Sequence, residues 1–304
     1  MPLDSNLGLP AGVTAWVVAA WLAELVLYTG TAFAAARRKL ADLPPAVLAA
    51  LLTASAVAPY CLYAPASGCF SLQGALWLPA LAGALSFWYV LWPRRRLADA
   101  GFLVMVAGVA LARVWKRVYL SPEAWPPMEA LGQLMWIRLG IVSALLLRRV
   151  EGVGFGWLPQ RREWKIGLKY FLFFLPVGAG LAMLGGFARW DPRVRPDWTG
   201  VAAVAGTFLG MLWVVALAEE FFFRGLLQRW LSEWLAGATR GWLAASLLFG
   251  LAHLPFREFP NWRFALLAAV AGLFYGRACW EGGGIRAAMV AHALTNTIWR
   301  TLLR

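Results

Sequence analysis

The sequence predicts an all-α membrane protein, a polytopic transmembrane bundle of about 8–10 helices. The chain has 304 residues, of which 61% are hydrophobic and 14% are charged, whereas soluble proteins carry roughly a quarter charged residues. Apolar runs close to the ~20 residues that cross a bilayer recur along the whole chain. The runs are continuous rather than alternating, which favours helices over the strands of a membrane barrel.

The formal net charge of +13 raises nucleic acid as a partner, but the positions of the basic residues favour a different explanation. They form short clusters between apolar runs, at 37–39, 94–96, 148–149 and 161–162. Short basic loops on one side of a membrane are typical of the positive-inside rule. We therefore expect these basic clusters to interact with the lipid bilayer, and we expect no nucleic acid as a partner of the protein.

Each predicted helix corresponds to one apolar run. If the N-terminus is outside, alternation places the basic clusters in the cytoplasm. The fourth run is the weakest, because Arg113, Lys116 and Arg117 interrupt it. The ten runs lie near 12–35, 45–63, 74–92, 99–119, 130–147, 168–188, 199–222, 240–255, 263–280 and 284–301.

Residues 1–10 contain no Lys or Arg, and so lack the basic segment that begins a cleavable signal peptide. The first helix is therefore expected to be retained, with the N-terminus outside. The abundance of Ala, Gly, Arg and Trp resembles that of a GC-rich bacterial gene, so we expect a multi-pass protein of a bacterial inner membrane.

A glycine-rich segment at 151–159, which ends in Pro159, predicts an internal boundary. It separates N-terminal transmembrane helices of unknown role, 1–150, from a C-terminal core, 151–304. The five earlier runs are apolar, aromatic and otherwise featureless. Cys61 and Cys69 flank an uncharged segment that is predicted to be external, where a disulfide and two free thiols are equally compatible with the sequence. Cys279 has no predicted partner.

The candidate chemistry begins with the acidic pair Glu219 and Glu220, which directly follows an apolar run. Glu220 and Arg224 are four residues apart, the favoured spacing for a helical ion pair. Glu219 points about 100° away and has Phe223 at its own i+4 position. A carboxylate without a basic partner is a candidate general base. The alternative is a solvated helix end.

Both histidines of the chain lie in later apolar helices. Phe249 and His253 are four residues apart, as are His292 and Asn296, so each pair shares a helix face. Taken singly, an interior histidine and an interhelical hydrogen bond explain these pairs better than catalysis does. Together with the acidic pair, however, they place ionisable groups on three helices within about eighty residues, and such groups are costly in a bilayer.

The ordered set Glu-Glu-x-x-x-Arg, Phe-x-x-x-His and His-x-x-x-Asn resembles the motifs of the CAAX protease and bacteriocin-processing family of intramembrane endopeptidases, which includes the Ras-converting CAAX prenyl protease. The resemblance covers roughly residues 199–300. It implies that Glu219 and His253 activate water for attack on a peptide carbonyl. It also implies that Glu220 and Arg224 organise the site, and that His292 and Asn296 stabilise the oxyanion, as suits their N–H donors.

The resemblance leaves two questions open. In the Ras-converting branch an Asn follows the first His by four residues, whereas this chain has Arg257, so the resemblance does not establish prenylated-cysteine specificity. Glu219, His253 and His292 are also the candidate ligands of a catalytic Zn²⁺ with water in the fourth position. The chain has no His-Glu-x-x-His helix, and we favour metal-free water activation with no cofactor.

The sequence therefore predicts an intramembrane endopeptidase, of the glutamate or metallo type, that cleaves a membrane-associated or lipid-anchored protein. One alternative is a non-catalytic immunity or assembly protein of the same fold, in which the motif residues would tolerate substitution. Another is a proton-coupled transporter, which would show paired inverted repeats. No internal repeat is visible, and the ionisable residues are concentrated in the second half.

Overall fold

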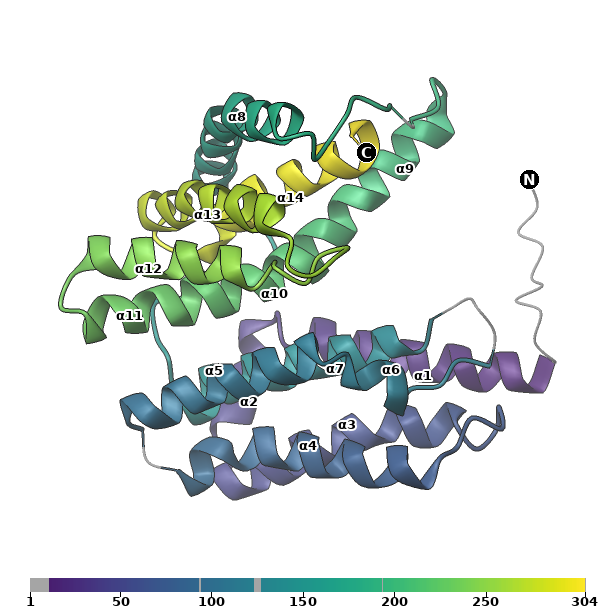
Figure 1. Ribbon diagram of the computed structural model, residues 1–304. Coiled ribbons are helices and arrows are strands. Elements are labelled where there is room, and N and C mark those ends of the chain that lie inside the picture. Colours follow the sequence, from purple (N-terminus) through teal and green to yellow (C-terminus); the bar gives the residue numbers. More distant parts are fainter. Residues whose placement is uncertain (1–10, 93, 123–126, 193, 304) are drawn as a thin grey trace. The chain divides into compact units, whose positions relative to one another are not determined.

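The computed structural model describes residues 11–92, 94–122, 127–192 and 194–303. Within these ranges the regular structure is helical (Figure 1), apart from an isolated antiparallel bridge between Trp190 and Leu303. The all-α prediction is confirmed. The expectation for residues 1–10 lies outside the described residues.

The chain forms two compact units, Met1–Glu151 and Gly152–Arg304. In the first unit, α1 packs on α3 and α7, and α4 packs on α3, α6 and α7. Its helices are α1 (Ala11–Gly30), α2 (Ala34–Ala41), α3 (Pro45–Tyr63), α4 (Leu72–Leu91), α5 (Arg96–Leu111), α6 (Val114–Val118) and α7 (Glu129–Val142), with the π-helical segment η1 (Ser143–Leu147).

In the second unit, α13 lies between α8 and α12 (Figure 1), and α14 packs on α8, α13 and η2. One continuous helix of 37 residues, Trp198–Trp234, contains α9 (Trp198–Gly210), η2 (Met211–Ala216), α10 (Leu217–Glu220), η3 (Phe221–Gln228) and α11 (Arg229–Trp234), of which η2 and η3 are π-helical. The others are α8 (Arg161–Leu184), α12 (Ala238–Leu251), α13 (Trp262–Gly282) and α14 (Ile285–Leu302).

Seven helices of the described residues are long and apolar enough to cross a membrane. The chain is therefore a multi-pass integral membrane protein. Three of the ten predicted runs fall in other helices: α5 has 16 residues, α12 has 14, and α14 is less apolar. The run at 99–119 ends early because Arg113 adopts a left-handed conformation, with φ of 50°, between α5 and α6.

Side-chain caps explain where several helices of the second unit begin. The Glu163 carboxylate accepts a hydrogen bond from the Gln160 backbone N–H at the start of α8, at 2.6 Å. Asp197 and Asn261 accept hydrogen bonds from Gly200 N and Phe264 N, at 2.9 and 3.0 Å. Such caps satisfy backbone N–H groups that have no partner within the helix.

The glycine-rich segment packs against the start of α14. Val153 O accepts a hydrogen bond from Ile285 N at 3.0 Å. Gly154 has φ of +67°, and a Cβ at this position would lie 2.7 Å from Gly284 Cα. A side chain is therefore excluded by both conformation and space.

All three cysteines are free thiols in the structure. Cys61 is exposed at the end of α3, Cys69 is half-buried in the following loop, and Cys279 is half-buried in α13. Of the two arrangements compatible with the sequence around Cys61 and Cys69, the structure has the unbridged one.

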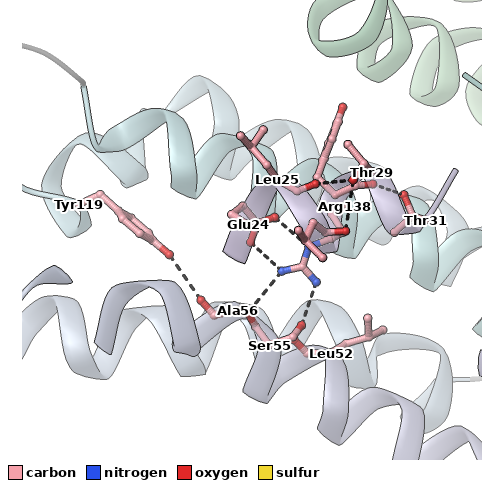
Figure 2. Close-up of polar contacts among 11 residues, drawn as sticks. Glu24, Leu25, Thr29, Thr31, Leu52, Ser55, Ala56, Tyr119 and Arg138 are labelled. Carbon is pink, nitrogen blue, oxygen red and sulfur yellow. Dashed lines mark hydrogen bonds and ion pairs between the residues drawn. The ribbon is translucent and has the colours of Figure 1, made fainter. Parts of the chain in front are cut away.

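The expectation that the five earlier runs are featureless is wrong, because the first unit contains a buried ion pair (Figure 2). Arg138 on α7 donates from Nε and Nη2 to the two carboxylate oxygens of Glu24 on α1, at 2.8 and 3.0 Å. Its Nη1 donates to Ser55 Oγ on α3 at 2.8 Å. The two charged side chains are 2% and 0% exposed. This network joins three helices. Because Glu24 and Arg138 are 114 positions apart in the sequence, no local sequence pattern predicts their contact.

A second ion pair lies near the end of η1. Arg148 donates from Nε and Nη2 to the Asp99 carboxylate at 2.7 and 2.9 Å. The Tyr89 hydroxyl donates to the same carboxylate at 3.1 Å. Part of the basic cluster at 148–149 is therefore neutralised within the first unit.

We expect Glu24→Gln and Arg138→Gln each to lower the free energy of unfolding by about 3–5 kcal/mol, because each leaves one buried charge without a partner. The double substitution Glu24→Leu with Arg138→Met removes both charges and should recover most of that loss. Unfolding of the purified protein in mixed micelles measures this. Asp42→Asn, at an exposed acid, is the control. Double and single variants of equal stability would show that the pair does not hold the helices together.

Candidate active site

The two candidate glutamates lie on α10, a single α-helical turn between η2 and η3. Glu220 is 0% exposed, whereas the Glu219 side chain is 31% exposed. Consecutive residues of an α-helix point about 100° apart, so one carboxylate enters the bundle while the other faces a cavity. π-helical segments are rare and occur often at functional sites. The sequence contains no signal that predicted them.

Two side chains, Arg224 and His292, contact the buried Glu220 carboxylate. Arg224 Nε lies 3.2 Å from Glu220 Oε2, and Arg224 Nη1 donates to Oε1 at 3.3 Å. His292 Nδ1 lies 2.7 Å from the same Oε1. Arg224 Nη2 also donates to Gly272 O on α13 at 3.2 Å. Glu220 and Arg224 are thus in direct contact, as their spacing predicts. Arg224 also contacts α13 through Gly272 O, and Glu220 also contacts α14 through His292.

Glu219 lies between the two histidines. Its Oε2 atom is 3.8 Å from His253 Nε2 and 3.8 Å from His292 Nε2. This oxygen is buried and makes no hydrogen bond within the described residues. The three predicted groups are therefore brought together at distances wider than a direct hydrogen bond. One water at about 2.8 Å from each atom can span such a separation.

The hydrogen bond of each histidine decides which nitrogen faces Glu219. His253 Nδ1 lies 2.7 Å from Phe249 O, and a backbone carbonyl only accepts, so Nδ1 carries the proton. His292 Nδ1 donates in the same way to the Glu220 carboxylate. In both rings Nε2 therefore remains to face Glu219, as an acceptor in neutral imidazole and as a donor in imidazolium.

A cavity of about 360 Å³ lies in front of these groups. Glu219, His253, His292 and Asn296 all line it. Within the described residues no hydrogen bond involves the Asn296 amide, which is available to a ligand. The remaining walls are largely apolar and come from α8, η2, α13 and α14, including Phe174, Met211, Leu267, Ala271 and Ile298.

Two aromatic residues that were not predicted as site residues support these polar groups. The Tyr275 ring stacks on the His292 imidazole, with centroids 4.7 Å apart and planes at 14°. The Phe249 ring lies 4.2 Å from the Arg224 guanidinium and 4.6 Å from the His253 ring. Phe249 occurs in the predicted Phe-x-x-x-His pattern, whereas no local pattern linked Tyr275 to His292.

Residues 201–298 match the model of a family described as type II CAAX prenyl endopeptidase Rce1-like. The matched segment contains every predicted site residue and covers about a third of the chain. The C-terminal unit is related to the CAAX proteases. The predicted relation to this family of endopeptidases is thereby confirmed. Comparisons with curated proteins and with solved structures gave no significant match.

Arg257, which occupies the place of an Asn in the Ras-converting branch of the CAAX proteases, lies in the loop between α12 and α13 with φ of 61°. Its guanidinium is 5.3 Å from the Phe187 ring and 5.5 Å from the Phe256 ring. Arg257 is not among the described residues that line the cavity. This cation therefore contacts aromatic rings and supplies no substitute for an Asn beside Glu219.

The three candidate zinc ligands do not fit a tetrahedral site. Zinc lies about 2.0–2.2 Å from each nitrogen or oxygen ligand, which places tetrahedral ligands about 3.3 Å apart. Both histidine nitrogens are 3.8 Å from Glu219 Oε2. Among the described residues no group of three or more His, Cys, Asp and Glu side chains is arranged to hold a metal ion.

We expect Arg224→Gln to lower the free energy of unfolding by about 3–5 kcal/mol, because the buried Glu220 charge loses its guanidinium. Arg224→Lys keeps the charge but loses the two-pronged contact and should fall in between. Adding Glu220→Gln to Arg224→Gln should restore part of the loss. Arg240→Gln, at an exposed arginine of α12, is the matched control and should change stability by about 0.5 kcal/mol or less. Equal stability of Arg224→Gln and this control would contradict the interpretation.

Proposed function

We propose that the protein is an intramembrane endopeptidase that hydrolyses a peptide bond of a membrane-associated or lipid-anchored protein by water activated at Glu219 and His253. The observation that carries this proposal is the Glu219 Oε2 atom, which is buried, makes no hydrogen bond within the described residues and lies 3.8 Å from each of two histidine nitrogens. The relation to an endopeptidase family supports the reaction class. Prenylated cysteine is not part of the proposal.

In the first step, a water bound between Glu219 and His253 attacks the carbonyl carbon of the substrate. Glu219 accepts the proton of the water, which is the role of a general base. His253 Nε2 accepts the other hydrogen bond of that water, because its Nδ1 proton is held by Phe249 O. The nucleophile is thereby oriented by two acceptors from different elements: Glu219 on α10 and His253 in the turn that follows α12, where the sequence predicts a helix.

The negative charge that develops on the carbonyl oxygen requires donors. Asn296 offers its amide N–H, and His292, whose Nδ1 lies 2.7 Å from the Glu220 carboxylate, offers Nε2–H in its imidazolium form. In the second step, the proton held by Glu219 passes to the leaving amine as the C–N bond breaks. The second proton of the attacking water, left on the new carboxyl group, also passes to the amine, so the products are a carboxylate and an ammonium, and the proposed step uses no metal or cofactor.

We also propose that the protein belongs to a bacterial inner membrane and has its N-terminus outside. The basic clusters between apolar runs support this orientation.

Glu219→Gln should lower kcat/KM by about 10²–10⁴-fold, because an amide cannot take a proton from water. The full chain, reconstituted in phosphatidylcholine nanodiscs, is incubated with a pool of apolar peptides, and cleavage products are quantified by mass spectrometry. Glu233→Gln, at an exposed acid of the same continuous helix, should cleave at the wild-type rate.

Undiminished cleavage by folded Glu219→Gln would contradict the proposed base. If no variant and no wild-type protein cleaves any peptide or any protein of its native membrane, the non-catalytic alternative replaces the proposal. Treatment of the wild-type protein with a metal chelator tests whether the step is metal-free. If the chelator abolishes cleavage and added zinc restores it, the metal-free step is contradicted.

Asn296→Ala should lower kcat by about 10²–10³-fold and leave KM nearly unchanged, because an oxyanion donor acts mainly in the transition state. Thr297→Val, one residue further on α14, is the control, since the Thr297 hydroxyl bonds only the helix carbonyl Ala293 O in the described structure. A rise in KM at constant kcat would instead assign Asn296 to substrate binding.

A further inference from the structure

Most basic residues of the first unit gather at one end of its helices. α2 contains the cluster at 37–39 and packs on η1. Arg94 Nη2 donates to Leu147 O at 3.0 Å, which brings the cluster at 94–96 beside the end of η1, where the cluster at 148–149 begins. These three clusters therefore lie at the same end of the unit, as the positive-inside rule predicts.

Three other basic residues lie at the opposite end: Arg113, Lys116 and Arg117, called here the α6 basic group. The 16 residues of α5 separate this group from the cluster at the start of that helix, a distance of about 24 Å at 1.5 Å per residue. The Tyr63 hydroxyl, at the end of α3 that is remote from α2, donates to Leu120 O at 3.2 Å, which fixes this placement (Figure 1). The rule that accounts for the other clusters does not account for this group.

α6 is held on α7 by its apolar side chains. Trp115, Val118 and Tyr119 are buried. A Cβ on Gly132 would lie 2.8 Å from Trp115 Cβ and 2.8 Å from Tyr119 Cδ2, so these side chains pack directly on the backbone of α7. By contrast, all three members of the α6 basic group are exposed. The fold thus fixes the place at which these cations meet the surroundings.

Little negative charge lies beside the α6 basic group, whose side chains form no ion pair within the described residues. α6 packs on α4, α5 and α7. α4 contains no acid, and Asp99 of α5 pairs with Arg148 at the other end of the unit. The remaining acid of these three helices is Glu129, in the first turn of α7. Three cations therefore stand against at most one carboxylate, which suits an anionic ligand.

Apolar side chains on either side of the group are exposed. Leu111, which ends α5, is 55% exposed, and Leu120, just after α6, is 43% exposed. In a multi-pass membrane protein such leucines contact the acyl chains of lipids. The anions found where acyl chains give way to water are lipid headgroups, and basic side chains there attract the anionic ones. An anionic phospholipid therefore matches this surface better than a soluble anion, because it reaches the leucines and the cations together.

We propose that the α6 basic group binds the phosphate headgroup of an anionic phospholipid, whose acyl chains lie against Leu111 and Leu120. Arginine forms paired hydrogen bonds with phosphate oxygens, and lysine adds a point charge. The site belongs to the first unit and does not depend on the proposed hydrolysis. It gives this unit a lipid-binding role in the leaflet opposite to that of the cluster at 94–96.

Photolabelling of the full chain tests this site. The protein is reconstituted in phosphatidylcholine nanodiscs that contain a small fraction of phosphatidylglycerol with a photoreactive diazirine on its headgroup. After illumination, labelled peptides are identified and quantified by mass spectrometry. Both faces of a nanodisc carry the probe, so labelling at 94–96 is an internal reference. Residues 111–120 should be labelled, and unlabelled phosphatidylglycerol should compete about tenfold better than phosphatidylcholine.

Each basic side chain at a membrane surface should contribute about fivefold to the binding of an anionic lipid. Lys116→Gln with Arg117→Gln should therefore lower the labelling of 111–120 by about 25-fold relative to wild type. Lys116→Arg with Arg117→Lys keeps both charges and should stay within about twofold of wild type. Arg95→Gln with Arg96→Gln, which removes the same charge from two exposed side chains at the other end, is the matched control and should leave 111–120 fully labelled.

Labelling of 111–120 that survives the two glutamine substitutions, or for which phosphatidylcholine competes equally well, would overturn the inference. Loss of labelling in the variant that keeps both charges would also overturn it, because the effect would then come from local structure. If soluble polyglutamate protects 111–120 and phosphatidylglycerol does not, the ligand is an acidic protein segment and the inference is wrong. None of these results bears on the proposed hydrolysis.

Discussion

The pairing of the buried Glu220 carboxylate is the constraint on which the rest of the second unit depends. A carboxylate removed from water is strongly destabilising unless charge and hydrogen bonds compensate it. Arg224 and His292 supply that compensation. Because Arg224 also donates to Gly272 O, the same contacts fix the register of α10, α13 and α14. Glu219, adjacent in sequence, is thereby directed at the two imidazole rings.

The two units meet this constraint in different ways. In the first unit the Arg138 guanidinium makes four hydrogen bonds, to Glu24 and Ser55, and both carboxylate oxygens of Glu24 accept one of them. In the second, Glu219 keeps a buried oxygen without a hydrogen bond within the described residues. A closed network stabilises a helix bundle, whereas an open one is a candidate for chemistry.

Interactions within one helix were predictable, and those between distant helices were not. The spacing of Glu220 and Arg224 predicted their contact, because helix periodicity relates residues four apart. The contact of Glu220 with His292 spans 72 residues, and the stacking of Tyr275 on that ring depends on how α13 and α14 pack. The lengths of the apolar runs located the long helices. Hydropathy alone could not show that α5 ends at Leu111, just before Arg113, which adopts a left-handed conformation.

Charge balance connects the proposed steps to the fold. With Glu219 and Glu220 ionised, Arg224 leaves the cluster one negative charge in excess. The imidazolium form of His292, which the proposed oxyanion contact requires, makes the cluster neutral. When Glu219 takes the proton of the water, the same cluster becomes net positive. That positive charge arises as the carbonyl oxygen becomes negative, beside His292 and Asn296. The buried pair Glu220 and Arg224 would therefore act without touching substrate, by setting the charge against which the proton transfer occurs.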